Sequence, residues 1–134
     1  MSIWRKILGI CDTKPPADPG CWSWEGGRVI IDLDRAGELD QPGGGLRLEG
    51  GGLPQRVLVV RDEDGRFHAF HNRCTHAGRR LDPLPGGGQV RCCSVGQSVF
   101  DDTGQPLSGS AKKTLQVFPV EQDGRRLMVK PTVG

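Results

Sequence analysis

The feature that most constrains this chain is a short cysteine–histidine motif that is followed by a pair of adjacent cysteines. One residue separates Cys74 from His76, and fifteen residues separate His76 from Cys92 and its neighbour Cys93. Thiolates and imidazoles are ligands for iron and zinc, and two loops can share one metal site only if the fold holds them together. The chain must therefore fold into hairpins that present two ligand-bearing loops side by side.

The residues around both loops extend this pattern. Segment 72–81 reads Asn-Arg-Cys-Thr-His-Ala-Gly-Arg-Arg-Leu, and segment 93–101 reads Cys-Ser-Val-Gly-Gln-Ser-Val-Phe-Asp. The first resembles the first ligand loop of Rieske [2Fe–2S] proteins. The second resembles their second loop, Cys-Pro-x-His-Gly-x-x-Phe-Asp. The resemblance extends from about Val29 to Val129, and it implies the Rieske fold with a [2Fe–2S] cluster as cofactor.

The resemblance also implies which residues bind the cluster. In this family two Cys thiolates hold one iron and two His imidazoles hold the other. Cys74, His76 and Cys93 match three of these ligands, whereas Gly96 stands where the second His is expected. Candidates for the vacant position are Cys92, His71, a residue of a partner, or water.

A second alignment of the second loop is also open. If Cys92 is the family cysteine, Gly96 matches a family glycine and Val95 replaces the histidine. The Ser-Val-Phe-Asp run at 98–101 instead keeps its family distance from Cys93. This run favours Cys93 as the ligand.

Three alternatives to an electron-transfer cluster remain. The fold could serve as a cluster-free accessory or interaction subunit, similar to small subunits of nitrite reductases. Zinc could bind Cys74, His76, Cys92 and Cys93, but adjacent side chains in an extended segment point to opposite faces, which disfavours ligation by both cysteines. The Cys92–Cys93 pair could also carry redox thiol chemistry.

The rest of the chain has the pattern of an all-β protein. Gly and Pro account for 31 of the 134 residues, which favours turns and short strands. An Asp-Gly turn at 62–65 between two apolar runs predicts a hairpin. We expect nine or ten strands in stacked antiparallel sheets and one helical turn at 35–39. The clearest strands are predicted at 29–33, 46–49, 57–61, 67–70, 89–91, 98–100, 115–120 and 127–129.

The length of the chain favours one domain over 1–134. We expect an irregular N-terminal lead at 1–27, with an edge strand that packs its tryptophans onto the domain, and a smaller cluster-binding subdomain at about 72–111. Cys11 and Cys21 lie in the lead, and either reaches the ligand loops only if the lead folds over them.

Composition and charge indicate where in the cell the protein is expected and which classes of partner it is expected to bind. Five cysteines, the absence of an export signal and the absence of an apolar run of about 20 residues predict a cytoplasmic protein with unpaired thiols and no membrane span. A net charge of +2 gives no support for nucleic-acid binding. No feature indicates an independent enzyme. We expect a larger oxidoreductase or redox partner, which could be held by the basic pairs at 79–80 and 112–113.

Overall fold

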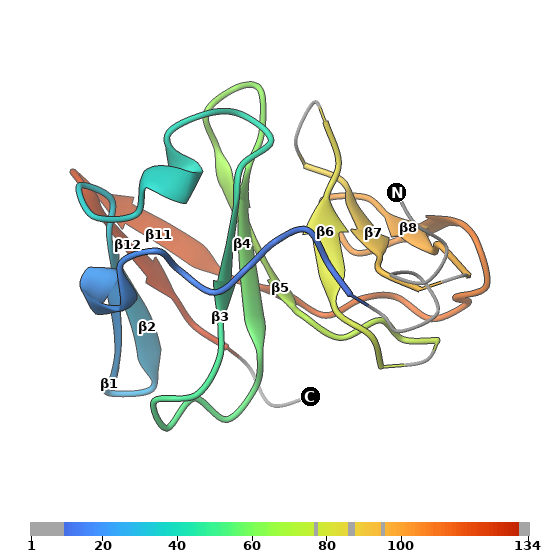
Figure 1. Ribbon diagram of the computed structural model, residues 1–134, viewed down its shortest axis with the longest axis horizontal. Helices are drawn as coiled ribbons and strands as arrows, with labels where there is room; N and C mark the ends of the chain where they lie inside the picture. The colour runs from blue at the N-terminus through green and yellow to red at the C-terminus, as the bar shows by residue number, and fades with distance from the viewer. Residues whose placement is uncertain (1–9, 77, 86–87, 95, 132–134) are drawn as a thin grey trace.

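The computed structural model describes residues 10–76, 78–85, 88–94 and 96–131. Its strands form three antiparallel four-stranded sheets, so the predicted all-β fold is confirmed (Figure 1). Two 3₁₀ turns, η1 (Pro19–Cys21) and η2 (Gly37–Leu39), accompany them. The strands are β1 (Trp22–Glu25), β2 (Arg28–Asp32), β3 (Gly45–Leu48), β4 (Val57–Arg61), β5 (Phe67–His71), β6 (Leu81–Pro83), β7 (Val90–Cys92), β8 (Val99–Phe100), β9 (Pro106–Ser108), β10 (Val117–Phe118), β11 (Val120–Asp123) and β12 (Arg126–Val129).

The three sheets share two hydrophobic cores. The first sheet has the order β1-β2-β12-β11, the second β10-β5-β4-β3 and the third β6-β7-β8-β9. Side chains of a strand alternate between its faces, and β4 divides accordingly: Val57 and Val59 pack toward the first sheet, whereas Leu58 and Val60 pack toward the third. Because both faces of β4 are buried, its sequence is a continuous apolar run.

The third sheet forms a separate lobe beside the other two (Figure 1). Its four strands run from Leu81 to Ser108, inside the limits of 72–111 expected for the cluster-binding subdomain. Phe100 and Leu81 of this sheet are fully buried against Phe70 of β5. The lobe is therefore anchored on the second sheet by its own apolar core.

One predicted strand was wrong in its extent. The run 115–120 was expected to be continuous, but it divides into β10 and β11 at Pro119. Proline has no N–H group to donate to a strand ladder. Consequently the chain leaves β5 of the second sheet after Phe118 and pairs with β12 of the first sheet from Val120 onward.

The described part of the N-terminal lead crosses the molecule from the third-sheet lobe to the first sheet (Figure 1). The backbone N–H groups of Asp12 and Thr13 donate to the carboxylate of Asp82 on β6, at 2.7 and 2.8 Å. The lead then ends in β1, an edge strand whose Trp22 and Trp24 pack against the first core, as expected. None of the helical turns in the described ranges is long and apolar enough to cross a bilayer.

Candidate functional site

The first ligand loop follows β5 and turns Cys74 inward. The backbone N–H of Cys74 donates to the carbonyl of Arg79 at 2.7 Å, and the carbonyl of Cys74 accepts the N–H of Gly78 at 2.9 Å. Gly78 has a φ of +73°, a conformation that side chains other than glycine's rarely tolerate. The fully buried Asn72 closes the loop, since its Oδ1 accepts the N–H of Leu81 at 2.8 Å. The loop thus holds the Cys74 thiol in the second core, with 1% of the residue exposed.

A single guanidinium braces this loop from the second sheet. Arg56 donates from Nε to the carbonyl of Asn72 and from Nη2 to the carbonyl of Gly78, both at 2.9 Å. These carbonyls lie at the two ends of the turn that contains Cys74. Arg56 therefore ties both ends of this turn to the start of β4.

The second ligand loop lies directly beside the first. The N–H of Cys92 donates to the carbonyl of Ser98 at 2.8 Å and closes the hairpin. The N–H of Cys93 donates across to the carbonyl of Arg80 at 3.0 Å. Since Arg79 and Arg80 are neighbours, each loop is joined to the same short connection.

A third segment covers both loops. A Cβ atom on Gly109 would lie 2.5 Å from the Cα of Ser98, and Gly109 has a φ of +89°, so only glycine fits there. The Oγ of Ser98 accepts the N–H of Ala111 at 2.9 Å. The hydroxyl of Thr75 donates to the carbonyl of Lys113 at 2.8 Å. Residues 108–113 therefore brace the two loops against each other.

The two thiols at the centre of this arrangement are Cys74 and Cys92. The Cys92 residue is 3% exposed, and its Sγ lies 3.1 Å from the Oγ of Ser94. A hydrogen bond with the Cys74 thiol, together with burial, raises the pKa of Cys92 far above its ordinary value. Two buried thiols side by side could together hold a cation that displaces their protons.

Cys93 faces the other side of the hairpin. It forms a disulfide with Cys11, with the two Cα atoms 5.2 Å apart. The prediction that the thiols are unpaired was therefore wrong for these two residues, because the lead does fold over the second loop. Cys21 is a free thiol buried in the first core. The expected alternation of adjacent side chains places Cys92, rather than Cys93, beside Cys74.

The three histidines differ in setting. His76 is exposed on the turn of the first loop. His71 is half-buried and stacks on Phe118 with ring centroids 6.2 Å apart, and burial together with nearby arginines lowers its pKa. His68 on β5 is half-buried, with Nε2 2.8 Å from the Oδ2 of Asp62. Asp62 begins the Asp-Gly turn, and its carboxylate holds the His68 ring through this contact.

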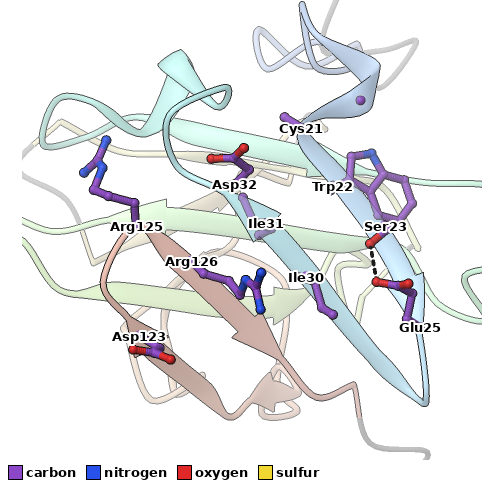
Figure 2. A pocket seen from close by; sticks show the side chains of 11 residues that line it. Cys21, Trp22, Ser23, Glu25, Ile30, Ile31, Asp32, Asp123, Arg125 and Arg126 are labelled. Atoms are coloured by element: carbon purple, nitrogen blue, oxygen red, sulfur yellow. Dashed lines mark hydrogen bonds between the residues drawn. The ribbon is translucent and has the colours of Figure 1, made fainter.

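A hollow on the first sheet is lined by residues of β1, β2, β11 and β12 and by none of the ligand-loop residues (Figure 2). It measures about 660 Å³ and is open to solvent. Its lining carries both signs of charge, from Glu25, Asp123 and Arg126 among others, and Ser23 donates a hydrogen bond to Glu25. No cysteine of the ligand loops contributes to it, and its mixed charges select no particular ligand.

Sequence reasoning missed the roles of three residues: Arg56 and Asn72 position the first ligand loop, and Asp82 fastens the N-terminal lead to β6. Their roles depend on contacts to backbone atoms distant in sequence, up to 70 residues for Asp82. Asn72 alone left a signal, because it lies two residues before Cys74 within the recognised loop.

Comparisons with known proteins agree with this geometry. A family model described as the Rieske [2Fe-2S] domain matches residues 32–119. The chloroplastic choline monooxygenase of Amaranthus tricolor is 32% identical over 136 residues, covering 90% of this chain and 30% of that protein. The glycine betaine monooxygenase oxygenase subunit of Pseudomonas aeruginosa is 48% identical over 44 residues, 33% of this chain and 10% of that one. The chain thus spans less than a third of these curated relatives.

Solved structures give a closer match in size. The ferredoxin of carbazole 1,9a-dioxygenase from Nocardioides aromaticivorans IC177 superposes with a TM-score of 0.62 at 28% identity, covering 77% of this chain and 95% of that one. A complex of reduced oxygenase and oxidized ferredoxin in carbazole 1,9a-dioxygenase gives a TM-score of 0.56 at 28% identity, over 67% and 82% of the two chains.

Proposed function

The chain belongs to the Rieske [2Fe–2S] domain family, and on that premise we propose that it carries electrons through a [2Fe–2S] cluster to a larger oxidoreductase of the oxygenase class. The observation that carries this proposal is the buried thiol pair of Cys74 and Cys92. The pair lies between two loops that share backbone hydrogen bonds with one connection. A cytoplasmic location is part of the same proposal.

The residues present supply both ligands for one iron of the cluster but only one of the two ligands for the other iron. Cys74 and Cys92 supply the two thiolates that one iron requires, and His76 on the first loop supplies one imidazole for the second iron. The position three residues after Cys92 is Val95, which lies outside the described residues, and Gly96 carries no ligand atom. We therefore propose non-standard ligation, with the fourth position open to water or to a partner's side chain.

A bound cluster would accept and release one electron at a time. The chain's own residues hold it and control its surroundings. Arg56 and Asn72 fix the first loop, while Gly109 allows residues 108–113 to approach the second. The thiolate end would lie in the apolar core, shielded from water, whereas the exposed His76 would face a partner. Electrons would therefore leave by the His76 side.

The surface around that side is basic. Arg79, Lys112 and Lys113 are exposed and flank the two ligand loops. Charged surfaces of this kind favour weak, rapidly reversible encounters between redox proteins. The complex reported for an oxygenase and its ferredoxin supports an oxygenase as the partner, which would present an acidic surface.

A second candidate is a cluster-free accessory subunit with the same fold. Two observations favour it: Gly96 offers no ligand, and Cys93 is held in a disulfide. In that case the buried thiols of Cys74 and Cys92 would serve only as packing groups of the second core.

Iron and sulfide content of the purified protein separates the two functions. We expect a coloured protein that a chemical reductant bleaches and that transfers its electron to an oxygenase component. Cys74→Ser should abolish the iron, while the matched control Cys21→Ser, a buried thiol in the other core, should retain it. A colourless parent without iron after anaerobic purification would establish the accessory role instead.

A further inference from the structure

A second group of ligand atoms lies on the outer side of the second loop. The Sγ atoms of Cys11 and Cys93 and a carboxylate oxygen of Asp82 all lie within 4.8 Å of one another. The three residues come from the N-terminal lead, the end of β7 and β6, and each is at most 8% exposed. We propose that they form a redox-gated site, closed by the disulfide when oxidised and able to bind a zinc-class divalent cation when reduced.

The orientation of Asp82 supports a metal site. Its Oδ2 and Oδ1 accept the backbone N–H groups of Asp12 and Thr13. Each carboxylate oxygen keeps a further lone pair for a cation, and hydrogen bonds of this kind orient the carboxylates that bind metals. These backbone donors do not depend on the redox state. The carboxylate therefore stays aimed at the sulfurs after the disulfide opens.

The donor set matches zinc. Two thiolates and one carboxylate leave a fourth tetrahedral position for water, a ligand count found at zinc sites with an open position. Two Zn–S bonds of about 2.3 Å at a tetrahedral angle require sulfurs roughly 3.8 Å apart. The Cα atoms, 5.2 Å apart, allow this after a rotation of the two side chains.

A groove gives access to the site. It measures about 780 Å³, opens to solvent, and is lined by Asp82 together with Thr13, Lys14 and Arg91. A hydrated cation or a small reductant can approach Asp82 through this opening.

The switch between the two states balances as a thiol–disulfide exchange. A dithiol reductant gives two electrons and two protons to the Cys11–Cys93 bond, which breaks, while the reductant's sulfurs form their own disulfide. Zinc then displaces one proton from each protein thiol to solvent. In both states the N-terminal lead stays fastened to the second ligand loop, first by a covalent bond and then by the cation. A reducing compartment would favour the zinc-bound state.

Zinc binding to the full-length protein tests this site. The non-reduced, denatured parent should show three reactive thiols, and the reduced protein five. After reduction with excess dithiol and anaerobic removal of that dithiol, the parent and Cys21→Ser should retain one more zinc ion per chain than the oxidised parent or reduced Cys11→Ser. Asp82→Asn should weaken this binding about tenfold or more, and its ability to form the disulfide on oxidation reports on its folding.

Equal zinc retention by the reduced parent and reduced Cys11→Ser would overturn the proposal. So would parent-like zinc affinity in Asp82→Asn, because the carboxylate would then be no ligand. Cys11→Ser changes only the lead, so it decides the matter even if Asp82→Asn fails to fold. Metal bound at Cys74 and Cys92 contributes equally to the parent and to Cys11→Ser, so it does not affect the difference between them. Failure of the proposed electron transfer would leave this difference unchanged.

Discussion

Cys92 and Cys93 are consecutive residues, but their thiols lie in two contrasting regions. Cys92 faces inward to Cys74, in an apolar core closed by the second sheet. Cys93 faces outward to Cys11 and Asp82, beside an open groove. The inner region suits a cofactor that must be shielded from water, and the outer region lies beside a groove through which small molecules can approach Asp82. Strand alternation alone therefore places two adjacent cysteines in two different surroundings.

The largest effect should come from restoring the missing imidazole, because its correct position depends on which cysteine faces inward. Counting a Cys-x-x-His spacing from Cys92 leads to position 95, and counting from Cys93 leads to position 96. We expect Val95→His to slow iron loss to a chelator by about tenfold or more, and to move the reduction potential into the range of two-histidine centres, about −150 to +300 mV. The visible absorbance and a redox titration measure both effects.

Gly96→His is the matched comparison. A Cβ atom at Gly96 would lie 3.0 Å from the Oγ of Ser110, so the new side chain would start against the covering segment. We expect little gain in iron retention from this variant, and none from Val95→Gln, which lacks an imidazole. Better retention in Gly96→His than in Val95→His would indicate that Cys93 is the inner ligand.

The outer region should contribute to stability rather than to iron content. Cys11→Ser removes a disulfide between residues 82 positions apart and should lower the free energy of unfolding by about 2–5 kcal/mol. Urea denaturation without reductant and with a chelator measures this loss. Adding a dithiol should remove the difference between parent and variant. A variant as stable as the oxidised parent would show that the disulfide does not form in solution.

A smaller loss is expected from Asn72→Ala, which affects the inner region only. The variant removes the buried acceptor for the N–H of Leu81 and should cost about 1–3 kcal/mol. It should also speed iron loss, because the first loop is no longer closed. The exposed Thr114→Ala serves as control and should change stability by less than about 0.5 kcal/mol. Equal urea midpoints for the two variants would mean that Asn72 does not brace the loop.

The smallest effect concerns an ion pair between the second sheet and the first loop. Burial would raise the pKa of Glu49, but hydrogen bonds from Arg80 and Arg47 outweigh it and lower the pKa below 4.5. Because the pKa is lower in the folded state, the ionised carboxylate stabilises the fold, and this contribution is complete above pH 4.5. It is lost as the pH falls through the pKa of the folded state. Glu49→Gln should cost at most about 1 kcal/mol at pH 7.

Urea denaturation at a series of pH values checks this sign. The difference in unfolding free energy between parent and Glu49→Gln should shrink as the pH falls below 4.5. A difference that stays constant down to acid pH would show that the Glu49 charge makes no contribution to stability.

Local patterns predicted most of the fold. Alternation placed Leu46 and Leu48 in the core, and the Asp-Gly turn placed the hairpin between β4 and β5. The division of the strand at Pro119 could have been foreseen from its missing donor. Which sheet each half joins depends on packing across the whole domain, and no local pattern contains that information.

Of the candidate site, too, the sequence predicted the local motifs but not the contacts between distant residues. The Cys-x-His motif identified the first loop, and alternation disfavoured the binding of one ion by both Cys92 and Cys93. The disulfide was not predicted, because an odd number of cysteines indicates no pairing and Cys11 lies 82 positions from its partner. Sequence distances within the Ser-Val-Phe-Asp run favoured Cys93, whereas the folded hairpin turns Cys92 toward Cys74.

The most direct test compares iron and sulfide in two variants of neighbouring residues. Cys93→Ser should keep two irons and two sulfides per chain, as in the parent, because its thiol belongs to the outer region. Cys92→Ser should contain neither, because the inner thiol pair is broken. The free energy of unfolding, measured alongside, ensures that loss of iron is not general unfolding. Loss of the cluster from Cys93→Ser with its retention in Cys92→Ser would contradict the assignment of the inner and outer regions.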